Sequence, residues 1–145
     1  TEQVYNMRHA QYMTWPRGMA IAEALWSPKE KRNWDDFSKR VEHHFKRLDL
    51  AGVKYAPSIY DPIIAAEKKD TTSVVLKLST ENDGLKIHYS FDNSFPDTWY
   101  PAYTEPLLVP KEASTVKLIT SREGKLIGRL LVIPVTDLKK RAGIK

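Results

Sequence analysis

The sequence predicts an α+β chain in which two helices precede an antiparallel, immunoglobulin-like β-sandwich. Two observations predict this fold class. Apolar residues recur at helical spacing from His9 to about Leu50, and short alternating runs broken by turn residues continue from about Ile59 to Pro134. We expect a helical domain over residues 1–55, a sandwich over residues 56–136 and a polar, frayed tail over residues 137–145.

The segment from Tyr12 to Trp26 predicts a helix that is apolar on nearly every side. Pro16 should kink or restart this helix, because proline lacks a backbone N–H and clashes with the preceding turn. Ser27-Pro28 should end it. A helix that is apolar all round is buried on more than one face, so we expect it to pack on the sandwich or on a second copy.

The residues from Trp34 to Leu48 predict a second, amphipathic helix. Asn33 is its expected N-cap, and Gly52 is the residue expected to stop it. His43 and His44 lie near its end, but adjacent residues on a helix do not face the same way. We therefore expect no metal site there.

The second half of the chain predicts short strands joined by turns. Asp83-Gly84 is typical of a β-hairpin turn, and His88 alternates with apolar neighbours, so its side chain should face solvent. The expected strands are Val74–Leu78, Leu85–Phe91, Pro106–Val109, Thr115–Thr120 and Leu126–Ile133, with a turn at Glu123-Gly124 between the last two.

Composition narrows the function classes. The hydrophobic fraction is 41%, the charged fraction is 28% and the net charge is +5. No apolar run is long enough to span a bilayer, and the basic residues alternate with acidic ones, so we expect neither a membrane span nor nucleic-acid binding. Cysteine is absent, which excludes disulfides and thiolate sites. We see no glycine-rich phosphate loop and predict no cofactor.

Two features of the sequence are candidates for a functional site. Glu23 lies within the apolar helix, and because a buried charge needs a partner we favour a structural ion pair with Arg17 over a catalytic role. The loop from Asp92 to Tyr103 is aromatic, and its Trp99 and Tyr100 are candidates for glycan stacking or for packing at an interface. Both interpretations of the loop stay open.

Several uncommon motifs occur together along the chain. The motifs in the helical half are Thr1-Glu2, Tyr12-Met13, Pro16-Arg17, Ala22-Glu23, Trp26-Ser27-Pro28 and Trp34-Asp35-Asp36-Phe37. The motifs among the later strands are Leu78-Ser79-Thr80-Glu81, Tyr89-Ser90 and Tyr103-Thr104-Glu105-Pro106. With these motifs the helical half resembles the end of the catalytic domain of glycoside hydrolase family 20, the β-N-acetylhexosaminidases, and the later strands resemble the small C-terminal domains beside such enzymes.

This resemblance implies that the two helices come from the end of a (β/α)8 barrel that removes terminal N-acetylhexosamine from glycans by substrate-assisted catalysis. It implies that Glu2 contacts the substrate and that the partners are such a glycan and the rest of the barrel. The family's catalytic Asp-Glu pair is absent from these 145 residues, so we expect the chain alone to be inactive.

Two other functions remain open for the sandwich. It could be a carbohydrate- or protein-binding module, or a structural domain that braces the barrel. The resemblance also implies a bacterial parent enzyme that is periplasmic, attached to the outer membrane or secreted, although these residues alone leave the compartment open.

Overall fold

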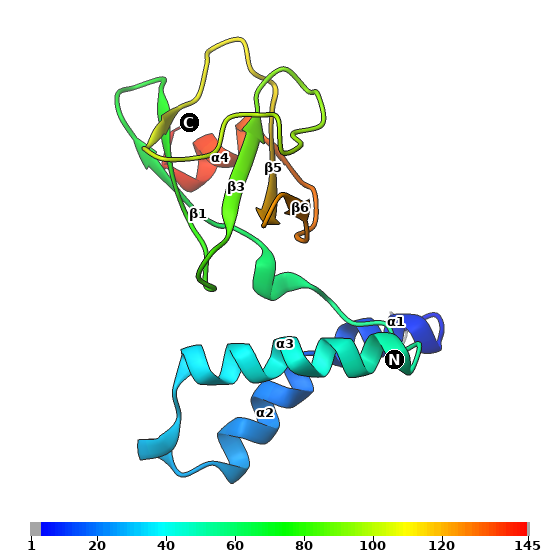
Figure 1. Cartoon of the computed structure of the whole chain (residues 1–145). Coiled ribbons are helices and arrows are strands. Elements are labelled where there is room, and N and C mark those ends of the chain that lie inside the picture. The colour runs from blue at the N-terminus through cyan, green and yellow to red at the C-terminus, as the bar shows by residue number, and fades with distance from the viewer. Residues whose placement is uncertain (1–3, 145) are drawn as a thin grey trace. The chain divides into compact units, whose positions relative to one another are not determined.

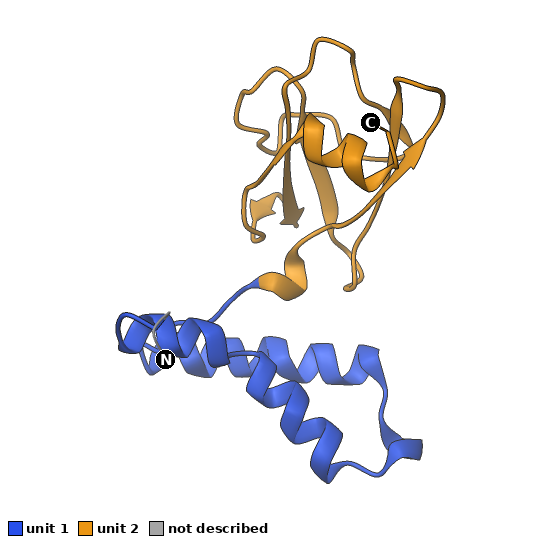
Figure 2. Ribbon diagram, turned by 180° about the vertical axis from the view of Figure 1, so that it is seen from behind, with its two compact units in different colours: residues 1–57 blue, residues 58–145 orange. Residues whose placement is uncertain are grey.

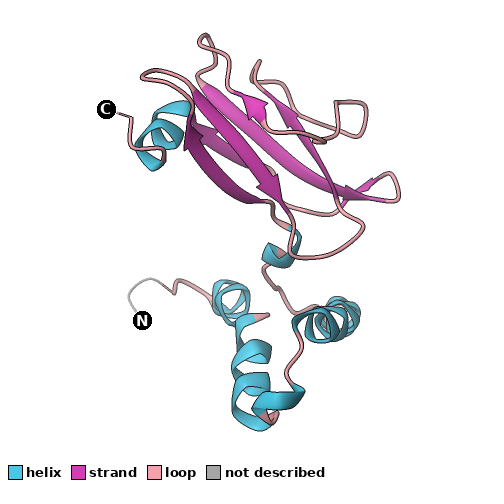
Figure 3. Cartoon of the chain, turned by 90° about the vertical axis from the view of Figure 1, so that its left-hand side faces the viewer, coloured by secondary structure: helices cyan, strands magenta, loops and turns pink. Residues whose placement is uncertain are grey.

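The computed structural model describes residues 4–144 of the chain. Two compact units are present, a helical unit of residues Thr1–Pro57 and a sandwich unit of residues Ser58–Lys145 (Figure 2). The coarse fold class is confirmed, because helices and antiparallel sheets occur in one chain and the sheets are arranged like a sandwich (Figure 3).

The helical unit has a helix break at Pro16, as the sequence predicts. Pro16 is the N-cap of the second helix, and Ser27 is the C-cap that ends it, as predicted. The Trp15–Pro16 peptide bond is cis. The described elements are α1 (Met7–Thr14), α2 (Arg17–Trp26), the 3-10 helix η1 (Lys29–Lys31) and α3 (Trp34–Leu50) (Figure 1).

Helix α3 is amphipathic, and its ends are confirmed. The side chain of Asn33 accepts a hydrogen bond from the backbone N–H of Asp36 at 3.0 Å. Gly52 follows the C-cap with φ +64°, a left-handed conformation that glycine adopts at little cost. The stripe that α3 buries contains Phe37, Val41 and Phe45.

Helix α2 differs from α3, because no residue of α2 is fully buried. Ile21 is 60% exposed, Leu25 74% and Trp26 88%. The composition of α2 predicted burial on more than one face. In the described part of the chain this apolar surface is open to solvent.

The sandwich unit contains one three-stranded and one four-stranded antiparallel sheet. The first sheet has the strand order β1-β2-β4, and in the second sheet β5 pairs with β3, β6 and β7. The strands are β1 (Ile63–Lys68), β2 (Val74–Ser79), β3 (Lys86–Ser90), β4 (Leu107–Leu108), β5 (Thr115–Arg122), β6 (Lys125–Leu126) and β7 (Leu131–Pro134).

The connection from β2 to β3 is not the hairpin that Asp83-Gly84 predicts. These two strands belong to different sheets, so the chain crosses the sandwich at this point. A two-residue type I′ hairpin needs positive φ at both central residues, whereas here only Gly84 has it, with φ +74°. Glu123 and Gly124 do have that geometry, with φ +51° and +75°, and they join β5 to β6 in the turn that the sequence predicts.

The core of the sandwich unit draws on both sheets and on a C-terminal helix. Leu76 of β2 and Leu118 of β5 are fully buried, and so is Leu138 of α4 (Val135–Arg141). Helix α4 packs against β1 and β7. Ile144 also joins this core.

The polar tail predicted over residues 137–145 is therefore wrong. Only two large apolar side chains, Leu138 and Ile144, interrupt this polar and basic stretch, so its composition hides the apolar face. The backbone N–H of Val135 donates to the carbonyl of Ser114 at 2.9 Å, where α4 begins.

A close contact breaks the strand predicted from Leu126 to Ile133 into β6 and β7. The backbone N–H of Gly128 donates to the carbonyl of Thr120 at 3.3 Å, and the Thr120 hydroxyl donates to the carbonyl of Tyr60 at 2.6 Å. A Cβ at residue 128 would lie 2.0 Å from Thr120 Oγ1. Glycine is therefore needed for this approach.

Candidate functional site

The aromatic loop of residues 91–103 covers the outer face of β3 and β5. In these strands Ile87 and Leu118 point into the core, so their neighbours His88 and Ile119, which are paired in register, point outward. Both outward residues are nevertheless buried. The loop also returns beside β3, where Ala102 bridges to His88.

His88 fastens this loop to the sheet. Its Nδ1 lies 2.9 Å from the carbonyl oxygen of Tyr100, and its Nε2 lies 2.8 Å from the hydroxyl of Ser121. A carbonyl oxygen only accepts, so Nδ1 carries a proton and donates to Tyr100, while Nε2 shares a hydrogen bond with the Ser121 hydroxyl. The sequence correctly placed His88 on the outer face, but the prediction that it is solvated is wrong because the loop covers it.

Further polar contacts fix the first part of the loop. The Ser90 hydroxyl donates to the carbonyl of Ser94 at 2.8 Å, and the Tyr100 hydroxyl donates to Ser94 Oγ at 2.6 Å. The Ser94 hydroxyl in turn donates to Asp92. This hydrogen bond, helped by the Ser94 backbone N–H, holds the pKa of Asp92 below its usual value. Lys117 donates to the carbonyl of Asn93.

Trp99 and Tyr100 are adjacent but differently placed. Trp99 is 92% exposed, although its backbone N–H is fixed by a 2.8 Å hydrogen bond to Asp97 Oδ1. Tyr100 is half-buried and anchors the loop through its hydroxyl and its carbonyl. Of this predicted pair, Trp99 is presented outward and Tyr100 supports the loop that presents it.

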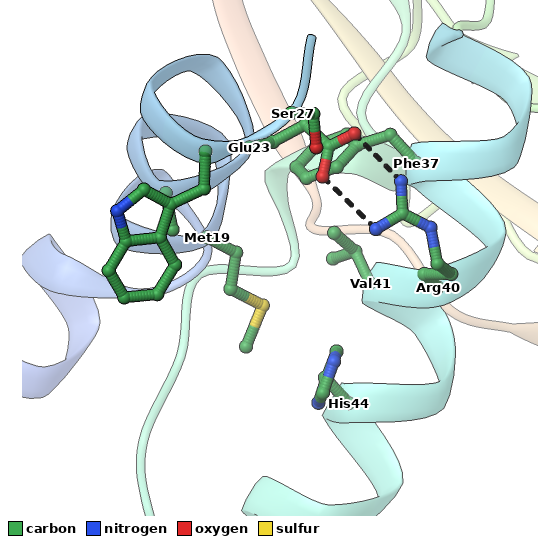
Figure 4. Close-up of a pocket in the computed structure, with 9 residues that line it drawn as sticks. Met19, Glu23, Ser27, Phe37, Arg40, Val41 and His44 are labelled. Carbon is green, nitrogen blue, oxygen red and sulfur yellow. Dashed lines mark hydrogen bonds and ion pairs between the residues drawn. The ribbon is translucent and has the colours of Figure 1, made fainter. Parts of the chain in front are cut away.

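A second candidate site is a pocket of about 300 Å³ between α2 and α3, lined by Met19, Glu23, Phe37, Arg40 and His44 among others. Figure 4 shows the carboxylate of Glu23 pointing at the guanidinium of Arg40, with Met19 and His44 nearby. The two hydrogen bonds of this ion pair measure 2.9 and 3.1 Å.

This ion pair has a different partner from the expected one, because Glu23 pairs with Arg40 of α3 and not with Arg17. The hydrogen bond from Arg40 holds the pKa of Glu23 below its usual value, against a smaller opposing effect of burial. Hydrogen bonds to Glu23 and Asp36 raise the pKa of Arg40. Both groups are charged at neutral pH, as a structural ion pair requires.

Other predicted features add no further site. Glu2 lies outside the described residues. His44 lines the α2–α3 pocket, but no group of three or more His, Cys, Asp or Glu that could hold a metal ion occurs in residues 4–144. Among the helices that the structure describes, none is long and apolar enough to cross a membrane.

Two comparisons with known proteins bear on what this chain is. Residues 76–132, which run from β2 into β7 of the sandwich unit, match the family model described as Fn3 associated. The chain is also similar to curated proteins that are named as hexosaminidases. The chain is 29% identical to a beta-hexosaminidase of Porphyromonas gingivalis over 107 residues, which are 73% of this chain and 14% of that protein.

Two further relatives have related names. A beta-hexosaminidase of Akkermansia muciniphila is 40% identical over 43 residues, or 30% of this chain and 9% of that protein. A beta-N-acetylhexosaminidase of Cellulomonas fimi is 36% identical over 58 residues, or 40% of this chain and 12% of that protein. The predicted relationship to hexosaminidase-like proteins is confirmed, and the chain spans only a small part of the length of these relatives.

Proposed function

We propose that this chain is the C-terminal part of a β-N-acetylhexosaminidase of glycoside hydrolase family 20, in which the helical unit completes the catalytic barrel and the immunoglobulin-like sandwich braces it. The match to the Porphyromonas gingivalis beta-hexosaminidase carries this proposal. It is longer than either unit alone, so it includes residues of both. The two units therefore accompany each other in a relative that is named as a hexosaminidase.

The parent enzyme would remove terminal N-acetylhexosamine by substrate-assisted catalysis, with the reaction carried out by residues outside this chain. In the mechanism that the resemblance implies, the substrate's acetamido group attacks the anomeric carbon and an Asp-Glu pair assists. A general acid must release a proton near neutral pH. The lowered pKa of Glu23 argues against that role in the pocket between α2 and α3. Because the family's Asp-Glu pair is absent from these 145 residues, the chain alone would be inactive. Glu2 would contribute a sugar contact.

The exposed surface of α2 supports a structural role for the helical unit. Ile21, Leu25 and Trp26 form a run of exposed apolar side chains on a helix of ten residues. Surface of this kind is typical of a contact with other protein. In the proposed enzyme the rest of the barrel covers it.

Activity measurements on two proteins test this proposal. The 145-residue chain should not release nitrophenol from p-nitrophenyl N-acetyl-β-glucosaminide, whereas a longer protein that contains this chain should. A longer protein in which the catalytic Asp and Glu are both replaced by their amides is the control for non-specific hydrolysis. Hydrolysis by the 145-residue chain itself, or an inactive longer protein that is folded and has an intact Asp-Glu pair, would contradict the proposal.

A further inference from the structure

Trp99 is a solvent-exposed aromatic side chain on a loop whose backbone is held by hydrogen bonds. Trp99 is 92% exposed, so a ligand that covered the indole ring would remove a large apolar area from water and be stabilised by that burial. Trp26 is almost as exposed at 88%, but it stands at the end of α2 beside Leu25, in the apolar surface already assigned to the barrel. In the loop of Trp99, Phe95 is the other large hydrophobic side chain that is exposed.

The loop is preorganised for presenting this ring. The backbone N–H of Trp99 donates to the carboxylate of Asp97 at 2.8 Å, and that of Tyr100 donates to the carbonyl of Asp97 at 3.2 Å. His88 binds the carbonyl of Tyr100. Pro96 is fully buried. A ligand that meets Trp99 therefore does not have to order the loop, which lowers the entropic cost of binding.

The charge of the loop restricts the charge of any ligand that binds at Trp99. Residues 91–103 contain two aspartates and no lysine or arginine. The carboxylate of Asp92 is engaged by Ser94, and that of Asp97 by the backbone of Trp99. The ammonium of Lys117 touches the loop, where it donates to the carbonyl of Asn93. The loop offers a phosphate or sulfate ligand no cation of its own and Lys117 is already engaged, so a neutral ligand is favoured.

The size of the apolar area argues against a protein partner. Phe95 and Trp99 are the only large hydrophobic side chains of the loop that are exposed. A stable protein interface buries about 800 Å² on each side, with a central apolar cluster. The small apolar area of these two side chains better matches a sugar ring, which has an apolar C–H face and a rim of hydroxyl groups.

We propose that Trp99 is a stacking platform for the pyranose ring of a neutral N-acetylhexosamine-containing glycan, and that His88 is the positioning residue that holds this platform in place. The glycan class rests on the proposed function. The platform itself rests on the exposure of Trp99, the hydrogen bonds of the loop and the absence of lysine and arginine from the loop's own sequence. The sandwich unit would then hold substrate near the enzyme in addition to bracing it.

Titration of the 145-residue chain with N,N′,N″-triacetylchitotriose, followed by NMR, tests this directly. We expect saturable shifts of the Trp99 indole signal and about tenfold or more weaker binding in Trp99→Ala. Trp26→Ala is the matched control and should bind like the parent chain. No saturable shift, equal binding by Trp99→Ala, or equal binding of chitotriose and cellotriose would overturn the proposal. Weaker association of Trp99→Ala with the remainder of the enzyme, with glycan binding unchanged, would replace the proposal with a protein contact.

A second variant tests the positioning role. His88→Gln keeps a donor and an acceptor but changes their geometry, so the sandwich should stay folded while the Trp99 indole becomes more mobile in its heteronuclear NOE and the glycan binds several-fold more weakly. Unchanged mobility and affinity in folded His88→Gln would contradict it. Binding is measured here without hydrolysis, so an inactive longer protein would refute the proposed function and leave the binding result intact.

Discussion

The two units bury their apolar side chains to very different degrees. In the sandwich unit both sheets and α4 share one core, in which Leu76, Leu118 and Leu138 are fully buried. In the helical unit α3 supplies the buried stripe, while α2 leaves Leu25 and Trp26 in solvent. The difference indicates that the sandwich unit has a closed core of its own, whereas the surface of α2 is suited to contact with further protein.

Matched leucine truncations should show this contrast most clearly. Leu138→Ala removes a fully buried side chain and should lower the free energy of unfolding of the sandwich by about 2–5 kcal/mol. Leu25→Ala changes a side chain that is 74% exposed and should cost the helical unit about 0.5 kcal/mol or less. Urea titration followed by NMR peak intensities reads the two units separately. We also expect Leu25→Ala to reduce self-association in light scattering. Equal losses from both variants would contradict the comparison.

Gly128→Ala should have the next largest effect, confined to the sandwich unit. The new Cβ would meet Thr120 Oγ1 at 2.0 Å, and overpacking of this kind costs about 1–3 kcal/mol. The double variant Gly128→Ala with Thr120→Ala removes the clashing hydroxyl, so its loss should be smaller than the sum of the two single losses. Additive losses would show that the contact with Thr120 is not the cause.

Low pH should destabilise the sandwich unit through protonation of Asp70. This is the smallest of the three predicted effects on stability. Hydrogen bonds from the Thr72 backbone and from Ser73 lower the pKa of Asp70 to about 2, from an unfolded value of about 4. Because the folded value is the lower one, this stabilisation is present above about pH 4 and is lost as the pH falls toward 2. In Asp70→Asn, unfolding followed between pH 7 and pH 2 should depend less on pH. An unchanged slope would argue against the role of Asp70.

The sequence predicts features that depend on a few neighbouring residues. Pro16, Asn33, Gly52 and Glu123-Gly124 each act through local backbone chemistry, and the structure has a break, a cap, a helix end and a turn where these residues predict them. Each of these features is determined by residues a few positions apart in the sequence. They can therefore be predicted without knowing which distant residues come into contact.

The missed features depend on residues that are distant in the sequence. The period of β3 places His88 on the outer face, but only the folded loop shows that this face is covered. Glu23 could not be paired correctly, because Arg40 comes from the next helix. Trp99 and Tyr100 formed one candidate pair in the sequence and have different roles in the structure.

Helix α4 has a practical consequence for any excised version of the sandwich. Cutting the chain at residue 136, where the pattern of strands ends, would remove Leu138 and Ile144 and leave their places among β1, β7 and the other core residues unfilled. A shortened chain of this kind would be prone to aggregation or proteolysis, and its failure to bind glycan would reveal nothing about Trp99. Binding studies on the isolated sandwich should therefore retain the chain through residue 144.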